Sequence, residues 1–413
     1  MKADIINVGD EVLLGYVINE NAAFLSQRLA SVGVELLYHT VVGDQAQYIS
    51  SAFRQAWERA DLILFTGGLG TTVDDLTKEV VSLELGLSLE KNEMWEKHLK
   101  NLYQKVGMEI NDKRLKQAYV PQGCTLLPNE NGTAAGLLIE KEGKIVILLP
   151  GPPDELKPMV QETVIPYLIS RSSGKIIKSR ILKVTGLGEA TLEDKIYEYI
   201  DGEGNPRVVL MAQLTEVHIY ITVKGMKMAE VENILKEREE KIRERLGSYI
   251  YGVNEETMEE VTARHLLSGK KTLATAESFT GGLLANKLTN IPGSSNYFLR
   301  GIVCYSNEAK NEIINVPWDI LNTTGAVSEE TARYMAENVR SSASADYGLS
   351  TTGYAGPSED FLEPVGLAYI GLATPEGTFC QRCSFWGDRK SIKEQGTDSA
   401  LNMLRLYLQG SLI

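Results

Sequence analysis

Cysteine, histidine and long apolar runs are all scarce in this sequence. The chain has 413 residues but only 4 cysteines and 4 histidines. Four scattered cysteines are too few for the disulfide framework that stabilises small secreted proteins. The first residues carry no apolar signal segment, and no apolar run approaches the ~18 residues that a membrane-spanning helix requires. We therefore expect a cytoplasmic protein without membrane association.

The same scarcity limits metal and redox chemistry. Cys380 and Cys383 form a C-x-x-C pair inside a strand-like segment, but no second pair accompanies it. The histidines do not pair at the spacing that zinc ligands require. The sequence therefore favours two ordinary strand residues over a zinc or dithiol site.

Positive charge is in deficit as well. Lys and Arg number 42 against 55 Asp and Glu, which gives a net charge of −13. A surface of this sign repels phosphate backbones, so the composition argues against nucleic-acid binding. Hydrophobic residues make up 43% of the chain. That fraction suits ordinary globular cores, and the length predicts two or three domains.

Alternating strand and helix patterns predict two α/β domains at the ends of the chain. We expect a doubly wound, parallel N-terminal sheet over residues 1–172, with Asp44 capping a helix over 45–59. A small α+β module is predicted over 173–253 and a second α/β domain over 254–413. The order of elements in the middle module resembles a KH-type RNA-binding fold. Because Gly186-Leu187-Gly188-Glu189 is not a G-x-x-G clamp, we expect this module to serve packing or dimerisation.

A glycine-rich loop is the strongest signal in the first domain. It follows the predicted strand 62–65 and runs Thr66-Gly67-Gly68-Leu69-Gly70-Thr71-Thr72-Val73-Asp74-Asp75. Glycines after a strand let backbone N–H groups approach a phosphate, and the next helix start adds a positive dipole. The loop is neither a Walker A motif nor a dinucleotide fingerprint. The candidate substrate-binding residues here are Gly67, Gly68, Gly70, Thr71 and, from a later turn, Gly151.

Paired carboxylates distinguish this loop. Asp74 and Asp75 would repel a phosphate unless a divalent cation lay between. Glu11 and Glu155 follow other strands of the predicted sheet and are candidate further metal ligands, because the carboxyl ends of parallel strands share one edge. The alternative is that the aspartates merely cap the next helix. The residues alone weigh these two interpretations about equally.

Ser278 is the corresponding signal in the C-terminal domain. It lies in Thr275-Ala276-Glu277-Ser278-Phe279-Thr280-Gly281-Gly282, at a predicted turn from strand to helix. A serine there stands above the sheet end, and the N–H groups of Gly281 and Gly282 are candidate donors to an oxyanion. A nucleophilic serine needs a base. His265, the only histidine of this domain, is predicted in a surface or packing position.

A lysine is the available base. Lys310 follows the next strand, in Tyr305-Ser306-Asn307-Glu308-Ala309-Lys310, so we expect it at the same sheet edge as Ser278. A lysine base must have a pKa well below the usual ~10.4, which requires burial or a neighbouring cation. The residues alone favour the alternative, in which Ser278 is a helix N-cap and Lys310 is solvated.

The N-terminal motifs are similar to those of a known family. Gly9-Asp10-Glu11, Thr66–Asp75 and Pro150–Glu155 resemble the molybdopterin-binding-like domain that opens the competence/damage-inducible CinA proteins. The resemblance implies an ADP-ribose pyrophosphatase that forms AMP and ribose 5-phosphate with a divalent metal. Molybdopterin-handling proteins share this fold, so the fold does not determine the substrate. The family usually has proline where this chain has Thr71.

The C-terminal motifs resemble the CinA carboxyl-terminal domain, which implies nicotinamide mononucleotide deamidase activity without a cofactor. Six segments match in order: Ala276–Gly282, Pro292–Ser295, Tyr305–Lys310, Gly325–Ser328, Thr352–Pro357 and Gly387–Arg389. On these motifs the resemblance implies Ser278 as nucleophile, Lys310 as base and Tyr305 as an assisting residue. The substrate-binding candidates of this domain are Thr280, Gly281, Gly282, Ser294, Thr352 and Arg389.

Two positions depart from the pattern of that domain. Phe279 stands where the family usually has cysteine, and its bulk bears on the shape of the nucleophile turn. Residues 358–363 read Ser-Glu-Asp-Phe-Leu-Glu where the family is usually glycine-rich. Added carboxylates disfavour a phosphorylated substrate unless they point away from it.

Three functional hypotheses follow. The leading one is a pyridine-nucleotide salvage enzyme that acts on nicotinamide mononucleotide and ADP-ribose and forms a homodimer. The second is a metal-dependent ADP-ribose pyrophosphatase alone. The third is non-enzymatic: an accessory protein of competence or DNA-damage responses, or a molybdopterin-binding protein, with degenerate sites.

Overall fold

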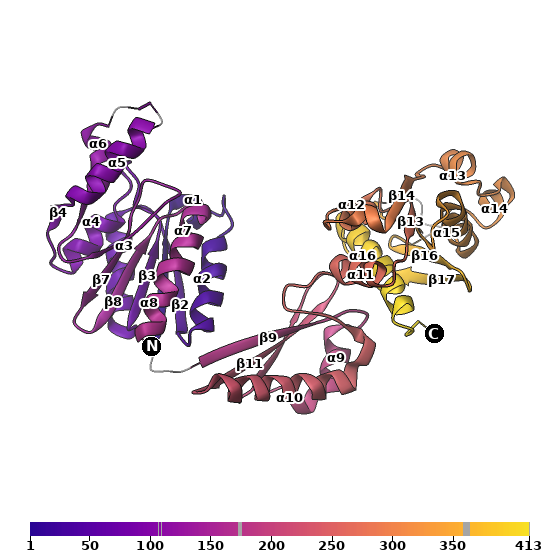
Figure 1. The fold of residues 1–413 in the computed structure, drawn as a ribbon, viewed down its shortest axis with the longest axis horizontal. Coiled ribbons are helices and arrows are strands. Elements are labelled where there is room, and N and C mark those ends of the chain that lie inside the picture. Colours follow the sequence, from indigo (N-terminus) through magenta and orange to yellow (C-terminus); the bar gives the residue numbers. More distant parts are fainter. Residues whose placement is uncertain (106, 109, 172–175, 358–363, 413) are drawn as a thin grey trace. The chain divides into compact units, whose positions relative to one another are not determined.

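The structure is a computed structural model that describes residues 1–105, 107–108, 110–171, 176–357 and 364–412 (Figure 1). By its internal contacts the chain divides into two compact units. The first comprises residues 1–178 and 223–233, and the second comprises residues 179–222 and 234–413. Within the described ranges, no helix has the length and apolarity that a membrane crossing requires.

A six-stranded sheet forms the centre of the N-terminal domain. Its strand order is β2-β1-β3-β8-β7-β6. The pairs among β2, β1, β3 and β8 are parallel, whereas β7 pairs antiparallel with both β8 and β6. The strands are β1 (Lys2–Val8), β2 (Glu35–Val42), β3 (Leu62–Thr66), β6 (Thr125–Leu127), β7 (Gly136–Lys141) and β8 (Lys144–Leu149), with a separate pair β4 (Leu89–Lys91) and β5 (Tyr119–Pro121).

Helices cover both faces of this sheet (Figure 1). One core joins the sheet to α3 (Ala46–Arg59), α4 (Thr77–Glu84) and α5 (Glu93–Lys105). A second core joins the other face to α2 (Glu20–Ser31), α7 (Pro153–Met159) and α8 (Ile165–Arg171). The short elements are α1 (Asp10–Leu13), α6 (Asp112–Leu115), η1 (Lys116–Ala118) and η2 (Val160–Val164). This two-faced arrangement is the predicted doubly wound fold.

The prediction that Asp44 caps α3 is wrong. The N-cap of α3 is Gln45, and no side chain caps its first turn. The Asp44 carboxylate instead accepts a hydrogen bond from the N–H of Asp10, at 2.9 Å. Asp44 therefore links the end of β2 to the start of α1, beside the sheet edge where strands end.

The middle domain is a four-stranded sheet with two helices. Its order is β10-β11-β9-β12, with strands β9 (Ile176–Val184), β10 (Arg207–Ala212), β11 (Val217–Gly225) and β12 (Ile250–Val253). Its helices are α9 (Glu189–Ile196) and α10 (Met228–Leu246), with short turns η3 (Tyr197–Tyr199) and η4 (Gly247–Tyr249). Side chains of β11 alternate between buried and half-buried, as expected for a sheet with one covered face.

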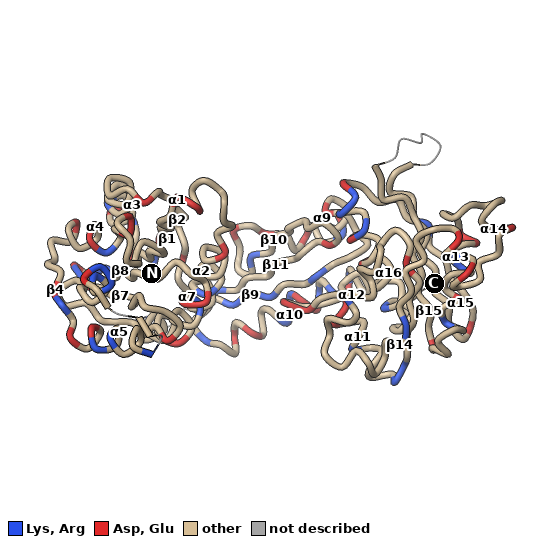
Figure 2. Tube along the Cα trace, turned by 90° about the horizontal axis from the view of Figure 1, so that it is seen from above, with Lys and Arg blue, Asp and Glu red and all other residues tan. Residues whose placement is uncertain are grey.

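Helix α10 confirms the prediction of a solvated charged face. Its outer side carries the i,i+4 pairs Lys236–Glu240 and Lys241–Glu237, while Arg243 pairs with the largely buried carboxylate of Glu239, which also pairs with Arg180 of β9. Its apolar side is buried. Figure 2 shows acidic and basic residues interspersed along the chain, so the negative net charge is spread over many elements.

A five-stranded sheet forms the centre of the C-terminal domain. Its order is β14-β13-β15-β16-β17. The pairs among β14, β13 and β15 are parallel, whereas β16 pairs antiparallel with both β15 and β17. The strands are β13 (Leu273–Glu277), β14 (Phe298–Val303), β15 (Tyr347–Gly353), β16 (Leu367–Thr374) and β17 (Gly377–Ser384).

Two sets of helices enclose this sheet. One core contains side chains of α11 (Met258–Ser268), α12 (Leu283–Thr289) and α16 (Arg389–Leu408). The core on the other face contains side chains of α13 (Asn307–Ile314), α14 (Trp318–Thr323) and α15 (Glu329–Ala343). One short turn, η5 (Ser294–Asn296), precedes β14. The register pairs Glu277, the last residue of β13, with Val303 of β14, so both strands end at one edge.

Candidate functional sites

Ser278 and Lys310 meet at the edge where β13 and β14 end. Ser278 follows β13 directly, and Lys310 lies in α13, the helix that follows β14. The Lys310 Nζ atom is 3.0 Å from the Ser278 Oγ atom. The predicted position of the lysine at the same sheet edge as the serine is therefore confirmed.

Lys310 is a buried lysine. Only 1% of its surface is exposed, and burial lowers the pKa of its amine from the ordinary value. The Nζ atom also lies 3.0 Å from the carbonyl oxygen of Cys304 and 3.3 Å from that of Tyr305. A neutral amine has two N–H donors for these carbonyls and one lone pair for the serine hydroxyl. The alternative of a solvated lysine is therefore wrong.

Ser278 does not cap a helix. Helix α12 begins at Leu283, its N-cap is Gly282, and no side chain caps it at that position. The Ser278 N–H donates to the carbonyl oxygen of Thr351 at 2.9 Å, which fixes the residue to the neighbouring strand β15. The N-cap interpretation of this serine is thus also wrong, and its hydroxyl faces the lysine.

Glu277 organises the turn that follows Ser278, and the sequence reasoning missed it. This carboxylate is 1% exposed. It accepts hydrogen bonds from the N–H groups of Gly282, Leu284 and Ala285 at 2.8–3.1 Å and from the hydroxyl of Thr280 at 2.7 Å. This buried carboxylate, with four donors, supplies the acceptor that the N-cap residue Gly282 cannot provide because it has no side chain. An acidic residue at the end of a buried strand, just before a helix start, is the signal that could have identified it.

This network corrects the predicted oxyanion donors. The Gly282 N–H donates to Glu277, and the Gly281 N–H donates to the carbonyl oxygen of Ser278 at 3.1 Å. Neither group is free for a substrate oxygen. Over the ranges that the structure describes, the N–H groups of Phe279 and Thr280 have no hydrogen-bond acceptor. These two follow the serine directly, where nucleophile elbows place an oxyanion donor.

Three other predicted residues of this domain, Arg389, Tyr305 and Thr352, each make a defined polar contact. Arg389, the first residue of α16, donates to the Tyr305 hydroxyl at 2.6 Å and to the Gly356 carbonyl oxygen at 2.5 Å. Tyr305 approaches the lysine through its carbonyl oxygen. The hydroxyl of the fully buried Thr352 donates to the Ala326 carbonyl oxygen at 2.6 Å.

Thr280, Ser294 and His265 have roles outside the serine–lysine pair. Thr280 is fully buried, and its hydroxyl donates to Glu277. Ser294 begins the turn η5, and within the described residues it makes no hydrogen bond to Ser278 or Lys310. His265 lies with a ring nitrogen 3.0 Å from Gln409 Nε2, so it does not serve Ser278 as a base.

The bulk of Phe279 is accommodated by a glycine. Phe279 is 3% exposed, and a Cβ atom added to Gly396 of α16 would lie 2.3 Å from its ring. The missing side chain at position 396 therefore makes room for the aromatic ring behind the nucleophile turn. The acidic segment 358–363 lies outside the described residues.

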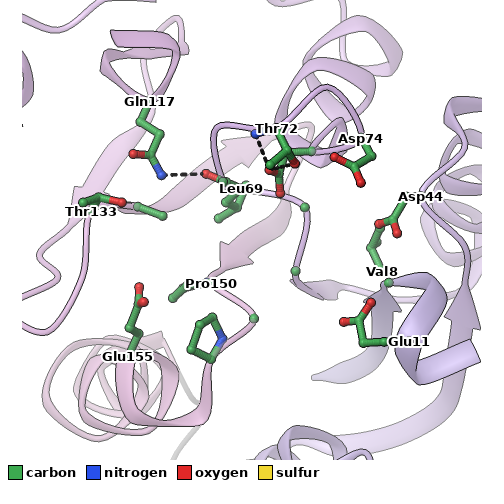
Figure 3. Close-up of a pocket in the computed structure, with 18 residues that line it drawn as sticks. Val8, Glu11, Asp44, Leu69, Thr72, Asp74, Gln117, Thr133, Pro150 and Glu155 are labelled. Carbon is green, nitrogen blue, oxygen red and sulfur yellow. Dashed lines mark hydrogen bonds between the residues drawn. The ribbon is translucent and has the colours of Figure 1, made fainter. Parts of the chain in front are cut away.

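The N-terminal site is a cavity of about 320 Å³. Figure 3 shows it at the sheet edge, with the glycine-rich loop above and the turn Pro150–Pro152 below. Predicted residues that line it are Gly67, Gly68, Gly70, Gly151, Asp74, Asp75, Glu11 and Glu155. Lining residues that sequence reasoning missed include Asp44, Gln117 and Thr133. Thr71 does not line the cavity, whereas its neighbour Thr72 does.

Two glycines of this loop are required by their surroundings. Gly67 and Gly68 have φ angles of +91° and +68°, which L side chains rarely adopt. A Cβ atom at Gly67 would lie 2.2 Å from the Val8 carbonyl oxygen, and one at Gly68 would lie 2.1 Å from Thr77 Oγ1. The loop backbone therefore packs against β1 and the start of α4, which holds it at the cavity.

The predicted set of four metal ligands does not converge. The Asp75 carboxylate accepts from the Thr72 N–H at 2.8 Å and the Thr72 hydroxyl at 2.5 Å, so it braces its own loop. Glu155 lies across the cavity from Glu11 and Asp74 (Figure 3). In the described part of the chain, no three His, Cys, Asp or Glu side chains are grouped to hold a metal ion. The residues do not fit a metal site made of protein ligands alone.

Negative charge nevertheless accumulates on one side of this cavity. Burial raises the pKa of Asp44, and the neighbouring carboxylates of Asp10, Glu11 and Asp74 raise it further. Burial also raises the pKa of Glu155, against a hydrogen bond from Asn129. Carboxylates whose pKa rises through mutual repulsion favour an added cation or proton between them.

Comparison with known proteins assigns a family model to each of the three domains. Residues 4–170 match the family model of a probable molybdopterin binding domain, residues 179–252 that of the damage-inducible protein CinA KH domain, and residues 255–408 that of the CinA C-terminal domain. A putative competence-damage inducible protein of Caldanaerobacter subterraneus subsp. tengcongensis is 47% identical over 414 residues, 100% of both chains. One of Clostridium beijerinckii is 44% identical over 409 residues, 99% of this chain and 100% of the relative.

A solved structure is similar over part of the chain. The protein CinA from Thermoplasma acidophilum is 36% identical, and the match covers 41% of this chain and 99% of that one with a TM-score of 0.39. The full-length relatives and the three family models together confirm the resemblance and the fold class. The chain belongs to the CinA family of competence-damage inducible proteins, with a molybdopterin-binding-like domain, a KH-like domain and a CinA C-terminal domain.

Proposed function

We propose that the C-terminal domain is an amidohydrolase that converts nicotinamide mononucleotide to nicotinate mononucleotide and ammonia. The observation that carries the proposal is the 3.0 Å approach of a buried lysine amine to the hydroxyl of a serine at the end of a strand. Ser-Lys pairs of this kind activate nucleophilic hydroxyls without histidine. The family resemblance supplies the substrate.

In the proposed reaction, Lys310 removes the proton from the Ser278 hydroxyl. The serine oxygen then attacks the carboxamide carbon, and the negative charge that develops on the carbonyl oxygen is stabilised by the N–H groups of Phe279 and Thr280. Lys310 returns the proton to the departing nitrogen, and ammonia leaves. A water molecule, deprotonated by the same amine, hydrolyses the acyl-enzyme and restores the free serine.

Arg389 is the candidate for binding the charged part of the proposed substrate. It is exposed at the start of α16 and already contacts Tyr305, the residue whose carbonyl oxygen contacts Lys310. A guanidinium has five N–H donors, so these contacts leave donors for a phosphate. We propose that Arg389 and the Tyr305 hydroxyl bind the substrate next to the dyad.

Ammonia release from nicotinamide mononucleotide by the purified chain tests this function. We expect turnover by the wild type, and a loss of at least ~10³-fold in kcat for Ser278→Ala and for Lys310→Ala. Ser341→Ala and Lys236→Ala change matched residues elsewhere and serve as controls that keep full activity. Equal trace release by wild type, Ser278→Ala and Lys310→Ala would overturn the proposal.

We propose, as a second activity, that the N-terminal domain hydrolyses the diphosphate bond of ADP-ribose. The observation that favours it is the cavity of about 320 Å³ between a glycine-rich loop and a group of carboxylates. Because the protein carboxylates do not group as a complete metal site, we expect any divalent cation to be shared with oxygens of the diphosphate. Magnesium is commonly bound in this way, through one or two carboxylates and substrate phosphates.

AMP formation from ADP-ribose tests the second activity. We expect AMP only when a divalent cation is added, and a large loss in Asp75→Ala, which removes a lining carboxylate and the brace on Thr72. Asp112→Ala, on the exposed first turn of α6, is the control. Equal AMP formation with and without a chelator would contradict the proposed requirement for a cation.

A further inference from the structure

A second cavity, of about 560 Å³, lies in the second unit, and neither Ser278 nor Lys310 lines it. Its walls are the loop 185–189 before α9, the turn 212–217 between β10 and β11, the end of β17 through Trp386, and one side of α16. The volume falls in the range of small-molecule sites. Neither proposed activity uses any of these residues.

Two contacts hold the walls together. The Tyr251 hydroxyl donates to the carboxylate of Glu216, a lining residue, and Arg405 Nη2 donates to the Ser248 carbonyl oxygen at 2.7 Å. Arg405 lies on α16 and is 1% exposed, while Tyr251 belongs to the core of the C-terminal domain. The cavity is therefore bounded by packed elements rather than by a single surface loop.

The charge of this cavity excludes anions. Of the described residues that line it, none is Lys or Arg, and three are carboxylates: Glu189, Glu216 and Asp398. Lys287 neutralises Asp398 at 2.6 Å, and Glu216 lies 2.5 Å from His218. Glu189 is exposed at the start of α9. The described lining offers a phosphate no Lys or Arg side chain, and Glu189 adds an exposed negative charge, so the ligand is neutral or cationic.

The remaining lining groups suit a nitrogen heterocycle with hydroxyl groups. Trp386 lines the cavity and is 69% exposed, and an indole ring is a stacking platform for a planar base. The amides of Gln213 and Gln381 can each donate and accept hydrogen bonds along a base edge. Carboxylates such as Glu189 accept hydrogen bonds from ribose hydroxyls.

We propose that this cavity binds an unphosphorylated nucleoside, with its base stacked on Trp386 and its ribose toward the carboxylates. The ligand class differs from both proposed substrates, which carry phosphate groups. The site stands on the cavity, its charge and its aromatic wall, and it does not depend on either proposed activity.

Isothermal titration of the full-length chain with adenosine and with nicotinamide riboside tests the proposal. We expect saturable binding of at least one nucleoside, and quenching of tryptophan fluorescence that is absent in Trp386→Phe. Ser399→Tyr places a ring in the cavity from α16 and should weaken this binding at least 10-fold. Ser341→Tyr, on an exposed position of α15, is the matched control that keeps it.

The monophosphates AMP and nicotinamide mononucleotide complete the experiment. Both can bind at the proposed active sites, so only the binding that Ser399→Tyr abolishes is compared. The affinity of this binding should be at least 10-fold lower for each monophosphate than for the nucleoside. A second variant, Gln381→Ala, changes an exposed strand residue of the lining and should weaken binding without filling the cavity. It distinguishes loss of the site from misfolding of Ser399→Tyr. The proposal is overturned if neither nucleoside binds saturably, if Ser399→Tyr and Gln381→Ala both leave binding unchanged, or if the monophosphates bind this cavity as tightly.

Discussion

At the scale of single residues, the buried amine of Lys310 dominates the chemistry. Burial disfavours its charged form, while the carbonyl oxygens of Cys304 and Tyr305 accept its N–H groups in either protonation state. Nearby Cys304 has a thiol whose pKa burial raises to about 11, so it adds no negative charge at neutral pH. The environment of Lys310 therefore favours the neutral base that the proposed reaction requires.

The amidase rate should accordingly depend on pH. We expect kcat/KM for nicotinamide mononucleotide to rise with pH and level off below ~10.4, the pKa of an unperturbed lysine, because only the neutral amine accepts the serine proton. Lys310→Arg, which stays protonated, should lose both the activity and the rise. A flat wild-type profile between about pH 6 and about pH 9 would contradict a lysine base.

The same lowered pKa makes stability depend on pH. Between the folded-state pKa of Lys310 and ~10.4, the unfolded chain binds a proton that the folded chain does not, so stability rises with pH in this window. Relative to Lys310→Met, the wild type should gain up to about 1.4 kcal/mol of unfolding free energy per pH unit there. Urea denaturation of both proteins at about pH 8, 9 and 10 measures the difference. A constant difference across this window would show that the lysine is protonated in the fold.

At the scale of elements, the turn from β13 to α12 depends on one carboxylate. Glu277 supplies the acceptor that Gly282, the N-cap residue, lacks, and it receives three backbone N–H groups of the first turn. Because Ser278 is the next residue along the chain, the position of the nucleophile follows from this network. We regard Glu277 as a positioning residue.

Replacing that carboxylate should affect catalysis and stability together. In Glu277→Gln an amide NH₂ group faces N–H donors, so we expect a loss of ~1–3 kcal/mol of stability and a lower kcat with little change in KM. Glu277→Asp should recover part of both, since it keeps the charge. Glu308→Gln, in the exposed first turn of α13, is the matched control. A normal kcat in Glu277→Gln would show that the turn does not position the serine.

The elements themselves were largely predictable from the sequence. The apolar runs of β3 and β8 predicted a parallel sheet, because strands that are buried on both faces consist of nearly continuous apolar residues. The turn from strand to helix after Ser278 was predicted, but not the residue at which α12 begins, Leu283. Sequence patterns locate a helix start only to within a few residues, and the buried Glu277 carboxylate that accepts the first N–H groups of α12 was not identified from the sequence.

The candidate sites were predictable in part. Because the carboxyl ends of parallel strands share one edge of a sheet, the approach of Ser278 and Lys310 could be inferred from two motifs. Contacts between segments that are far apart in the sequence could not be inferred. The packing of Phe279 against Gly396, for example, joins residues 117 positions apart. The bracing of Asp75 by Thr72 is local, but its geometry depends on the loop backbone, which composition does not determine.

At the scale of the whole molecule, the two proposed sites lie in different compact units. The glycine-rich loop and its cavity belong to the first unit, and the serine–lysine pair belongs to the second. No residue is shared between the two sites. Substitutions without shared partners usually act independently.

We therefore expect the two activities to be separable in the intact chain. Ser278→Ala should abolish ammonia release and leave AMP formation from ADP-ribose unchanged, and Asp75→Ala should do the reverse. Removing divalent cations with a chelator should stop AMP formation alone. Parallel assays of both products on the same preparations measure this. Loss of both activities through either substitution would show that the units act as one.

Helix α16 has a consequence for biosynthesis. It begins with Arg389, and the absence of a side chain at Gly396 makes room for the Phe279 ring behind the serine turn. Its buried leucines complete the C-terminal core. Until residues 389–408 have left the ribosome, a nascent chain has the serine and the lysine but no finished scaffold around them. A chain that stops before Arg389 would thus have a first domain that can fold and a proposed amidase site without its supporting helix.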